Sequence, residues 1–67
     1  MESVAVKNQW VKEGDLVEVV TTGTGEVEEV TAMSDPYYDN EERADVINVA
    51  GGLGYAKWNV ARSRWEF

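Results

Sequence analysis

The sequence predicts an all-β fold, namely a small five-stranded barrel. Valines alternate with other residues along several short segments, which is the pattern of half-buried strands. Turns containing glycine separate these segments at near-regular spacing, as in small sandwiches and barrels. No segment has the apolar repeat of an amphipathic helix. Because the chain has only 67 residues, we expect a single domain over residues 1–67.

The first expected elements are an N-terminal segment and a hairpin. Residues 4–11 (VAVKNQWV) alternate loosely and predict a short leading strand or an arm. A hairpin is expected over residues 15–34, folded at TTGTG, whose glycines can adopt positive φ. In its first strand Glu18 must face solvent, so Val17 and Val19 are assigned to the core.

The returning strand of this hairpin, residues 26–33, departs from strict alternation. Val27 and Val30 are three residues apart, so a regular strand would place them on opposite faces. A bulge at Glu28 and Glu29 is predicted, because it would bring both valines to the core side.

A long irregular segment and a second hairpin follow. Residues 34–45 (SDPYYDNEERAD) are expected to form a loop, with Asp35 and Pro36 starting one helical turn. Residues 46–60 (VINVAGGLGYAKWNV) predict strand, glycine-rich turn and strand, and residues 65–67 predict a last short strand after a tight turn.

The predicted core combines the inward positions of these strands with aromatic residues. Trp10, Trp58 and Trp65 are also assigned to it, since so small a core needs large side chains. The eight core positions predicted from the strands are Val17, Val19, Val27, Val30, Ile47, Val49, Trp58 and Val60.

Two segments carry a resemblance to a known superfamily of barrels. GDLVEVVTTGTGEVEEV resembles the Gly-Asp-x-Val-x-Val, Gly, x-Val pattern of KOW and Tudor-type barrels. KWNVARSRWEF resembles their fourth strand, one-turn 3₁₀ bridge and fifth strand. The resemblance covers roughly residues 10–67 and implies an SH3-like small β-barrel. It implies a fold rather than one function, because such folds carry many functions.

The charge of the chain argues against nucleic acid as a partner. Thirteen acidic and six basic residues give a net charge of −7, which repels phosphate backbones. The acids gather in two sets, one on a strand and one in the long loop. The strand set is Glu26, Glu28 and Glu29, and the loop set is Asp35, Asp39, Glu41, Glu42 and Asp45.

The composition also argues against an enzyme, a metal site or a bound cofactor. Without histidine and cysteine, nucleophilic sites that use them and ordinary zinc sites cannot be built. DNEE at residues 39–42 lacks the spacing of a calcium loop, and no glycine motif for phosphate is present. WNVARSRWE is loosely similar to type II dihydrofolate reductases, which form an oligomeric pore. However, YAKW at residues 55–58 replaces that family's Val-Gln-Ile-Tyr tetrad.

The candidate binding residues lie in the long loop and at the start of the second hairpin's returning strand. Aromatic rings beside carboxylates favour a cationic ligand, such as an arginine or lysine side chain of a protein or peptide. The alternative is that one tyrosine of the loop only covers an open barrel end. The predicted partner-binding residues are Tyr37, Tyr38, Asp39, Glu41, Glu42 and Tyr55.

The sequence therefore predicts a non-enzymatic interaction module that binds a basic protein surface or peptide. The alternative is a phage-type inhibitor that imitates nucleic acid with its acidic surface. Solubility or adaptation to high salt would explain the acidity without any partner. We expect a cytoplasmic monomer or homodimer that binds neither nucleic acid nor membrane, since no apolar run is long enough to span one.

Overall fold

The regular secondary structure of the described residues consists of β-strands. A computed structural model describes residues 4–51 and 53–67, and within them the strands form one six-stranded sheet in the order β2-β1-β6-β5-β4-β3. The strands are β1 (Leu16–Val20), β2 (Val27–Thr31), β3 (Tyr37–Asp39), β4 (Ala44–Asn48), β5 (Tyr55–Asn59) and β6 (Arg64–Glu66). None of the described residues belongs to a helix long and apolar enough for a membrane crossing. The predicted all-β class is confirmed, but the sheet has six strands instead of five and is not closed.

The first predicted hairpin is confirmed, whereas the predicted bulge is wrong. β1 and β2 pair without interruption from Leu16↔Thr31 to Val20↔Val27. Because no extra residue interrupts this register, Val27 lies on the face opposite the core and is 56% exposed. On that face Val27 pairs with Val20, so it does not reach the core side as the predicted bulge required.

The second predicted hairpin is also confirmed, as β4 and β5. Between the two strands Gly54 donates its N–H to the Gly51 carbonyl at 2.9 Å. Trp58 lies on the core side as predicted, but Val60 does not and is 80% exposed. The reason is that β5 ends at Asn59, so Val60 belongs to the next turn and no longer follows the alternation.

β3 occupies part of the segment that we expected to be irregular. Tyr37–Asp39 pairs with Ala44–Val46 of β4, and a turn over residues 40–43 joins them. The predicted helical turn at Asp35 is absent. Instead, the Asp35 carboxylate accepts a hydrogen bond from the Glu13 N–H at 2.8 Å and ties two loops together.

The C-terminal strand completes the sheet by pairing on both sides. β6 is antiparallel to β5 and parallel to β1, where Val19 and Val20 face Trp65 and Glu66. The residues before it, 60–63, form a tight turn that is not a 3₁₀ helix. Asn59 stabilises that turn by accepting a hydrogen bond from the Arg62 N–H at 3.0 Å.

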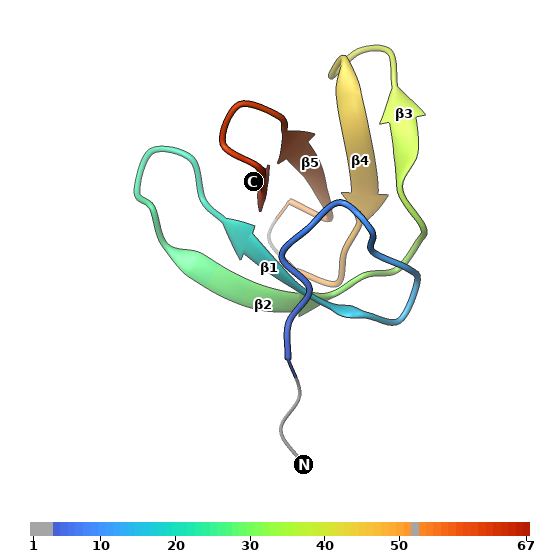
Figure 1. The fold of residues 1–67 in the computed structure, drawn as a ribbon, viewed down its shortest axis with the longest axis vertical. Coiled ribbons are helices and arrows are strands. Elements are labelled where there is room, and N and C mark those ends of the chain that lie inside the picture. The colour runs from blue at the N-terminus through green and yellow to red at the C-terminus, as the bar shows by residue number, and fades with distance from the viewer. Residues whose placement is uncertain (1–3, 52) are drawn as a thin grey trace.

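The sheet curls until the ends of β2 and β4 meet. Ala32 and Val49 form an antiparallel bridge, and the Met33 N–H donates to the Asn48 carbonyl at 2.7 Å. In Figure 1 the β1–β2 hairpin accordingly runs at a steep angle to β3 and β4. This contact joins only the strand ends, so β2 and β3 remain the two edges of an open sheet.

The residues around Val6 form an arm that runs along β1. Val6 bridges to Val17 in a parallel sense, and its N–H donates to the Leu16 carbonyl at 2.7 Å. Further along, the Asn8 carbonyl accepts a hydrogen bond from the Trp65 indole at 2.9 Å. The arm thereby satisfies the single polar atom of a fully buried tryptophan side chain.

The core lies on the concave side of the curled sheet. Trp58 and Trp65 pack edge to face with ring centroids 5.3 Å apart. Trp10, also assigned to the core from sequence, is 76% exposed, because the arm is fixed through its backbone and through Val11 instead. Six of the eight core positions predicted from the strands are buried: Val17, Val19, Val30, Ile47, Val49 and Trp58.

Candidate functional site

The face of the sheet opposite the core carries the candidate site. Directly paired residues of neighbouring strands project from the same face of a sheet. The register therefore aligns one row of side chains across all six strands, on the side away from the tryptophans. This row is Tyr37, Val46, Lys57, Glu66, Val20 and Val27. We call this side the outer face.

A cavity of about 350 Å³ opens on the outer face between β3, β4 and β5. The sequence-predicted residues in its lining are Tyr37, Asp39, Glu41, Glu42 and Tyr55. The other lining residues are Val46, Asn48, Leu53 and Gly54. Five of the six predicted partner-binding residues are therefore brought together around one cavity, which we call the first cavity.

Tyr38 is the predicted residue that the structure places elsewhere. It pairs with Asp45 on the core side of β3, beyond the end of the core, and is 61% exposed. Adjacent residues of a strand project from opposite faces, so Tyr37 and Tyr38 cannot both line the first cavity.

The turn between β3 and β4 presents the acidic side chains of the site. Asp39 accepts hydrogen bonds at one carboxylate oxygen from the N–H groups of Glu41 and Glu42, at 2.8 and 3.1 Å. This is the local side-chain capping typical of aspartate in turns. The cap fixes the backbone of Glu41 and Glu42, which both line the first cavity.

Hydrogen bonds also orient the two tyrosines. The Tyr37 hydroxyl donates to the Asn48 amide oxygen at 2.9 Å, within the lining of the first cavity. The Tyr55 hydroxyl lies 3.4 Å from the Glu42 carboxylate, at the limit of a hydrogen bond. Both rings are thereby anchored at their polar ends, which leaves their faces as the apolar walls of the cavity.

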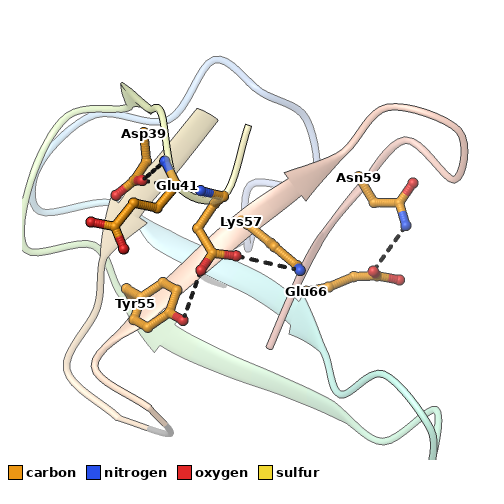
Figure 2. A network of polar contacts seen from close by, with 7 residues as sticks. Asp39, Glu41, Tyr55, Lys57, Asn59 and Glu66 are labelled. Carbon is orange, nitrogen blue, oxygen red and sulfur yellow. Dashed lines mark hydrogen bonds and ion pairs between the residues drawn. The ribbon is translucent and has the colours of Figure 1, made fainter. Parts of the chain in front are cut away.

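A second cavity, of about 200 Å³, adjoins the first. Glu42, Leu53 and Tyr55 line both cavities, and we call the two neighbouring cavities together the outer groove. Figure 2 shows Asp39, Glu41 and Tyr55 at one end of this region, Glu66 and Asn59 at the other, and Lys57 between them. The remaining lining residues of the second cavity are Thr22, Lys57, Glu66 and Phe67.

Glu66 is a buried carboxylate in the lining of the second cavity, with only 3% of its surface exposed. The hydrogen bond donated by the Asn59 amide at 2.9 Å is the main cause of a lowered pKa for Glu66. Burial opposes this by raising the pKa, and the Arg64 guanidinium, 2.6 Å away, lowers it further. Glu66 is therefore held as an anion by residues of its own hairpin.

Sequence reasoning missed several residues of the groove. Lys57 and Glu66 were not selected, although strand alternation places each on the face opposite its tryptophan neighbour. Alternation within each strand could have identified their face, but their position beside each other also depends on the register between β5 and β6. Val46 and Leu53 carry no signal of their own, because their roles depend on how the turns fold over the sheet.

The arrangement offers carboxylates and aromatic faces to a ligand. Among residues 4–51 and 53–67, no group of three acidic side chains has an arrangement that could hold a metal ion. Of the three carboxylates that line the first cavity, only Glu42 lies within 4 Å of a basic nitrogen in the described part of the chain. The carboxylates of Asp39 and Glu41 can therefore interact with a cation from outside.

Comparison with known proteins adds no relative to this picture. No protein-family model matches the chain, and neither the curated proteins nor the solved structures include a significant match to it. The description of the site therefore depends on the geometry of this chain alone.

Proposed function

We propose that the protein is a non-enzymatic interaction module whose outer groove binds a cationic side chain of a basic protein or peptide. The observation that carries this proposal is the gathering of three carboxylates and two tyrosines around the first cavity. A lysine or arginine side chain would place its charge among Asp39, Glu41 and Glu42. Its aliphatic stem would contact the rings of Tyr37 and Tyr55.

The charge balance of the site supports the proposal. No basic residue lines the first cavity, and the whole chain carries a net charge of −7. A field of this sign raises the local concentration of cations and the rate at which a basic partner arrives. The tyrosine rings add contact area, which acids alone lack.

We also propose that the fold is a distant, open variant of the SH3-like barrel. Two features support this relation: the contact between the ends of β2 and β4, and the tight turn that leads into a last strand paired with β1. The added edge strand β3, which pairs with β4, is the departure from the five-stranded pattern. In this proposal it adds the wall that carries Tyr37.

The test of the binding proposal is an NMR titration with N-acetyl-arginine amide, a singly charged probe. N-acetyl-citrulline amide is the matched neutral probe, because it has nearly the same shape without the charge. We expect the arginine probe to shift the amide signals of Tyr37, Glu42 and Tyr55, with weak affinity, and the citrulline probe to leave them unchanged. Equal shifts with both probes, or none with either, would contradict the proposal.

Two tyrosine variants provide an internal control for that titration. Tyr37→Ala removes a wall of the first cavity, whereas Tyr38→Ala removes a neighbouring, similarly exposed ring from the other face. We expect Tyr37→Ala to weaken binding of the arginine probe by roughly two- to fivefold, as for an exposed cation–π contact. Tyr38→Ala should bind the probe like the wild type. Equal effects would place the contact outside the groove.

One observation favours a second candidate, imitation of nucleic acid by the acidic surface. On the outer face Glu18 and Glu29 face each other directly, an arrangement that costs stability because like charges repel. Glu26, Glu28 and Glu29 are all exposed along the edge strand β2 and the turn before it. If charge reversal of these three residues abolishes binding to a natural partner and groove variants do not, this candidate takes precedence.

A further inference from the structure

Lys57 is the basic side chain in the lining of the outer groove. It lies beside the acidic residues Glu42 and Glu66. Its ammonium nitrogen lies 3.5 Å from one carboxylate oxygen of Glu42. The other Glu42 oxygen is the one near the Tyr55 hydroxyl. In Figure 2 a dashed line at the end of the Lys57 side chain marks its ion pair with Glu42.

Lys57 has a second acidic neighbour, but that neighbour is already occupied. Glu66 faces Lys57 directly across β5 and β6, yet its two oxygens accept hydrogen bonds from Asn59 and Arg64. Glu42 is therefore the acid with which Lys57 pairs within the described residues.

The pair between Lys57 and Glu42 is open to exchange. The side chains are 45% and 31% exposed, so water reaches both partners. Ion pairs of this kind contribute little to stability, because solvent screens them and two long side chains must be ordered. Since Glu42 lines both cavities, its carboxylate can meet Lys57 from one side or a ligand from the other.

We propose that Lys57 is an internal competitor: its ammonium pairs with Glu42 in the free protein and competes with a ligand cation for that carboxylate. This inference rests on the proposed function, because it requires that the outer groove bind cations. Lys57 then sets the affinity of the site, and any loss of its positive charge strengthens ligand binding. In the free protein, the Lys57 side chain therefore occupies part of the binding site.

The experiment compares two variants that remove one positive charge each. Lys57→Gln removes the competitor, whereas Lys7→Gln removes a lysine whose partner is Glu18, at 3.9 Å and outside the groove. Both variants lower the net charge from −7 to −8, so their long-range effects on a cationic probe are matched. The dissociation constant of N-acetyl-arginine amide is measured by NMR titration for the wild type and both variants.

We expect Lys57→Gln to bind the arginine probe about two- to fivefold more tightly than the wild type, the range that an exposed ion pair implies. Lys7→Gln should change the dissociation constant by less than about 1.5-fold at physiological salt, where distant charges are screened. In a Glu42→Gln background, Lys57→Gln should give no more tightening than Lys7→Gln, because the carboxylate under competition is gone.

The outcomes separate this inference from the function on which it rests. If the wild type binds the probe at the groove and Lys57→Gln tightens binding no more than Lys7→Gln, the competitor role is overturned and the binding function stands. The same holds if Lys57→Gln still tightens binding in the Glu42→Gln background. If none of the proteins binds the probe, the proposed function fails and the inference fails with it.

Discussion

Glu66 links the stability of the fold to pH at the level of a single residue. Its pKa is lowered in the folded state from the ordinary value of a glutamate carboxyl, which applies to the unfolded chain. A lowered folded pKa means that Glu66 stabilises the fold above the unfolded pKa. This contribution is lost as the pH falls through the folded value. The effect depends on Asn59 and Arg64, which hold the carboxylate as an anion.

Glu66→Gln should therefore destabilise the protein at pH 7 by about 1–3 kcal/mol, because it removes the partner of a half-buried guanidinium. The difference in unfolding free energy between wild type and variant should shrink as the pH falls through the lowered pKa of folded Glu66, since the wild-type carboxylate then becomes protonated. Urea unfolding at several pH values measures this. A difference that stays constant with pH would contradict the role given to the charge.

Asp39 is the residue that orients the acidic turn of the site. Asp39→Ala should lower the unfolding free energy by about 1 kcal/mol, because two backbone N–H groups lose their acceptor. The control is Asp45→Ala, at an exposed position in the neighbouring strand. That variant should unfold within about 0.5 kcal/mol of the wild type. Equal unfolding energies for both variants would show that the turn forms without the cap.

Among the strands, β5 and β6 contribute the largest side chains of the core. Trp58 is 9% exposed and Trp65 is fully buried against it, so truncation of Trp58 leaves a large cavity. Trp58→Ala should cost about 3–5 kcal/mol, close to the whole stability expected of so small a domain. Circular dichroism during urea unfolding measures the loss. Trp10→Ala is the matched control and should change stability by no more than about 0.5 kcal/mol.

The elements also show why sequence reasoning succeeded in some places and failed in others. Strong alternation bounded by glycine turns located both hairpins, since one buried face fixes the register. β3 was missed because three residues are too few to show a period, and their pairing is set by β4. Val60 was wrongly assigned to the core because β5 ends at Asn59, and a valine just after a strand looks the same in the sequence as one within it. Val27 was wrongly assigned because the predicted bulge is absent from the register between β1 and β2.

The candidate site shows the same limit. The acidic and aromatic character of residues 37–42 could be identified from composition. The separation of Tyr37 from Tyr38 required knowledge that this segment is extended. Lys57 required the register between β4 and β5, which places it opposite Val46. Residues far apart in the chain meet in the groove only through the sheet order, and no local pattern encodes that order.

For the whole molecule, the net charge of −7 governs which partners can approach. The protein should show no measurable binding to single-stranded or duplex DNA or to RNA at physiological salt, because it lacks the basic cluster that releases counterions from phosphates. Fluorescence anisotropy with labelled oligonucleotides tests this. Saturable binding to any of them would contradict the charge argument.

The same negative charge should speed the association with a basic partner. Its rate constant should fall as salt rises, and Glu41→Gln combined with Glu42→Gln should lower the rate and flatten that dependence. Stopped-flow measurements over a range of salt concentrations provide the rates. A salt dependence unchanged by these substitutions would place the steering charges elsewhere, with the exposed acids of β2 as the next candidates.

The exposure of Trp10 gives the protein an optical probe of its own arm. Trp58 and Trp65 are shielded, while Trp10 is 76% exposed, so the fluorescence should divide into a protected and an accessible population. Because the net charge of −7 attracts cations and repels anions, quenching of the accessible population relative to free N-acetyl-tryptophanamide should be stronger with caesium than with iodide. If the arm leaves β1, Trp65 loses its hydrogen bond to Asn8, and its emission becomes accessible to quenchers as well. The emission maximum and the extent of quenching then report whether the arm is docked on β1.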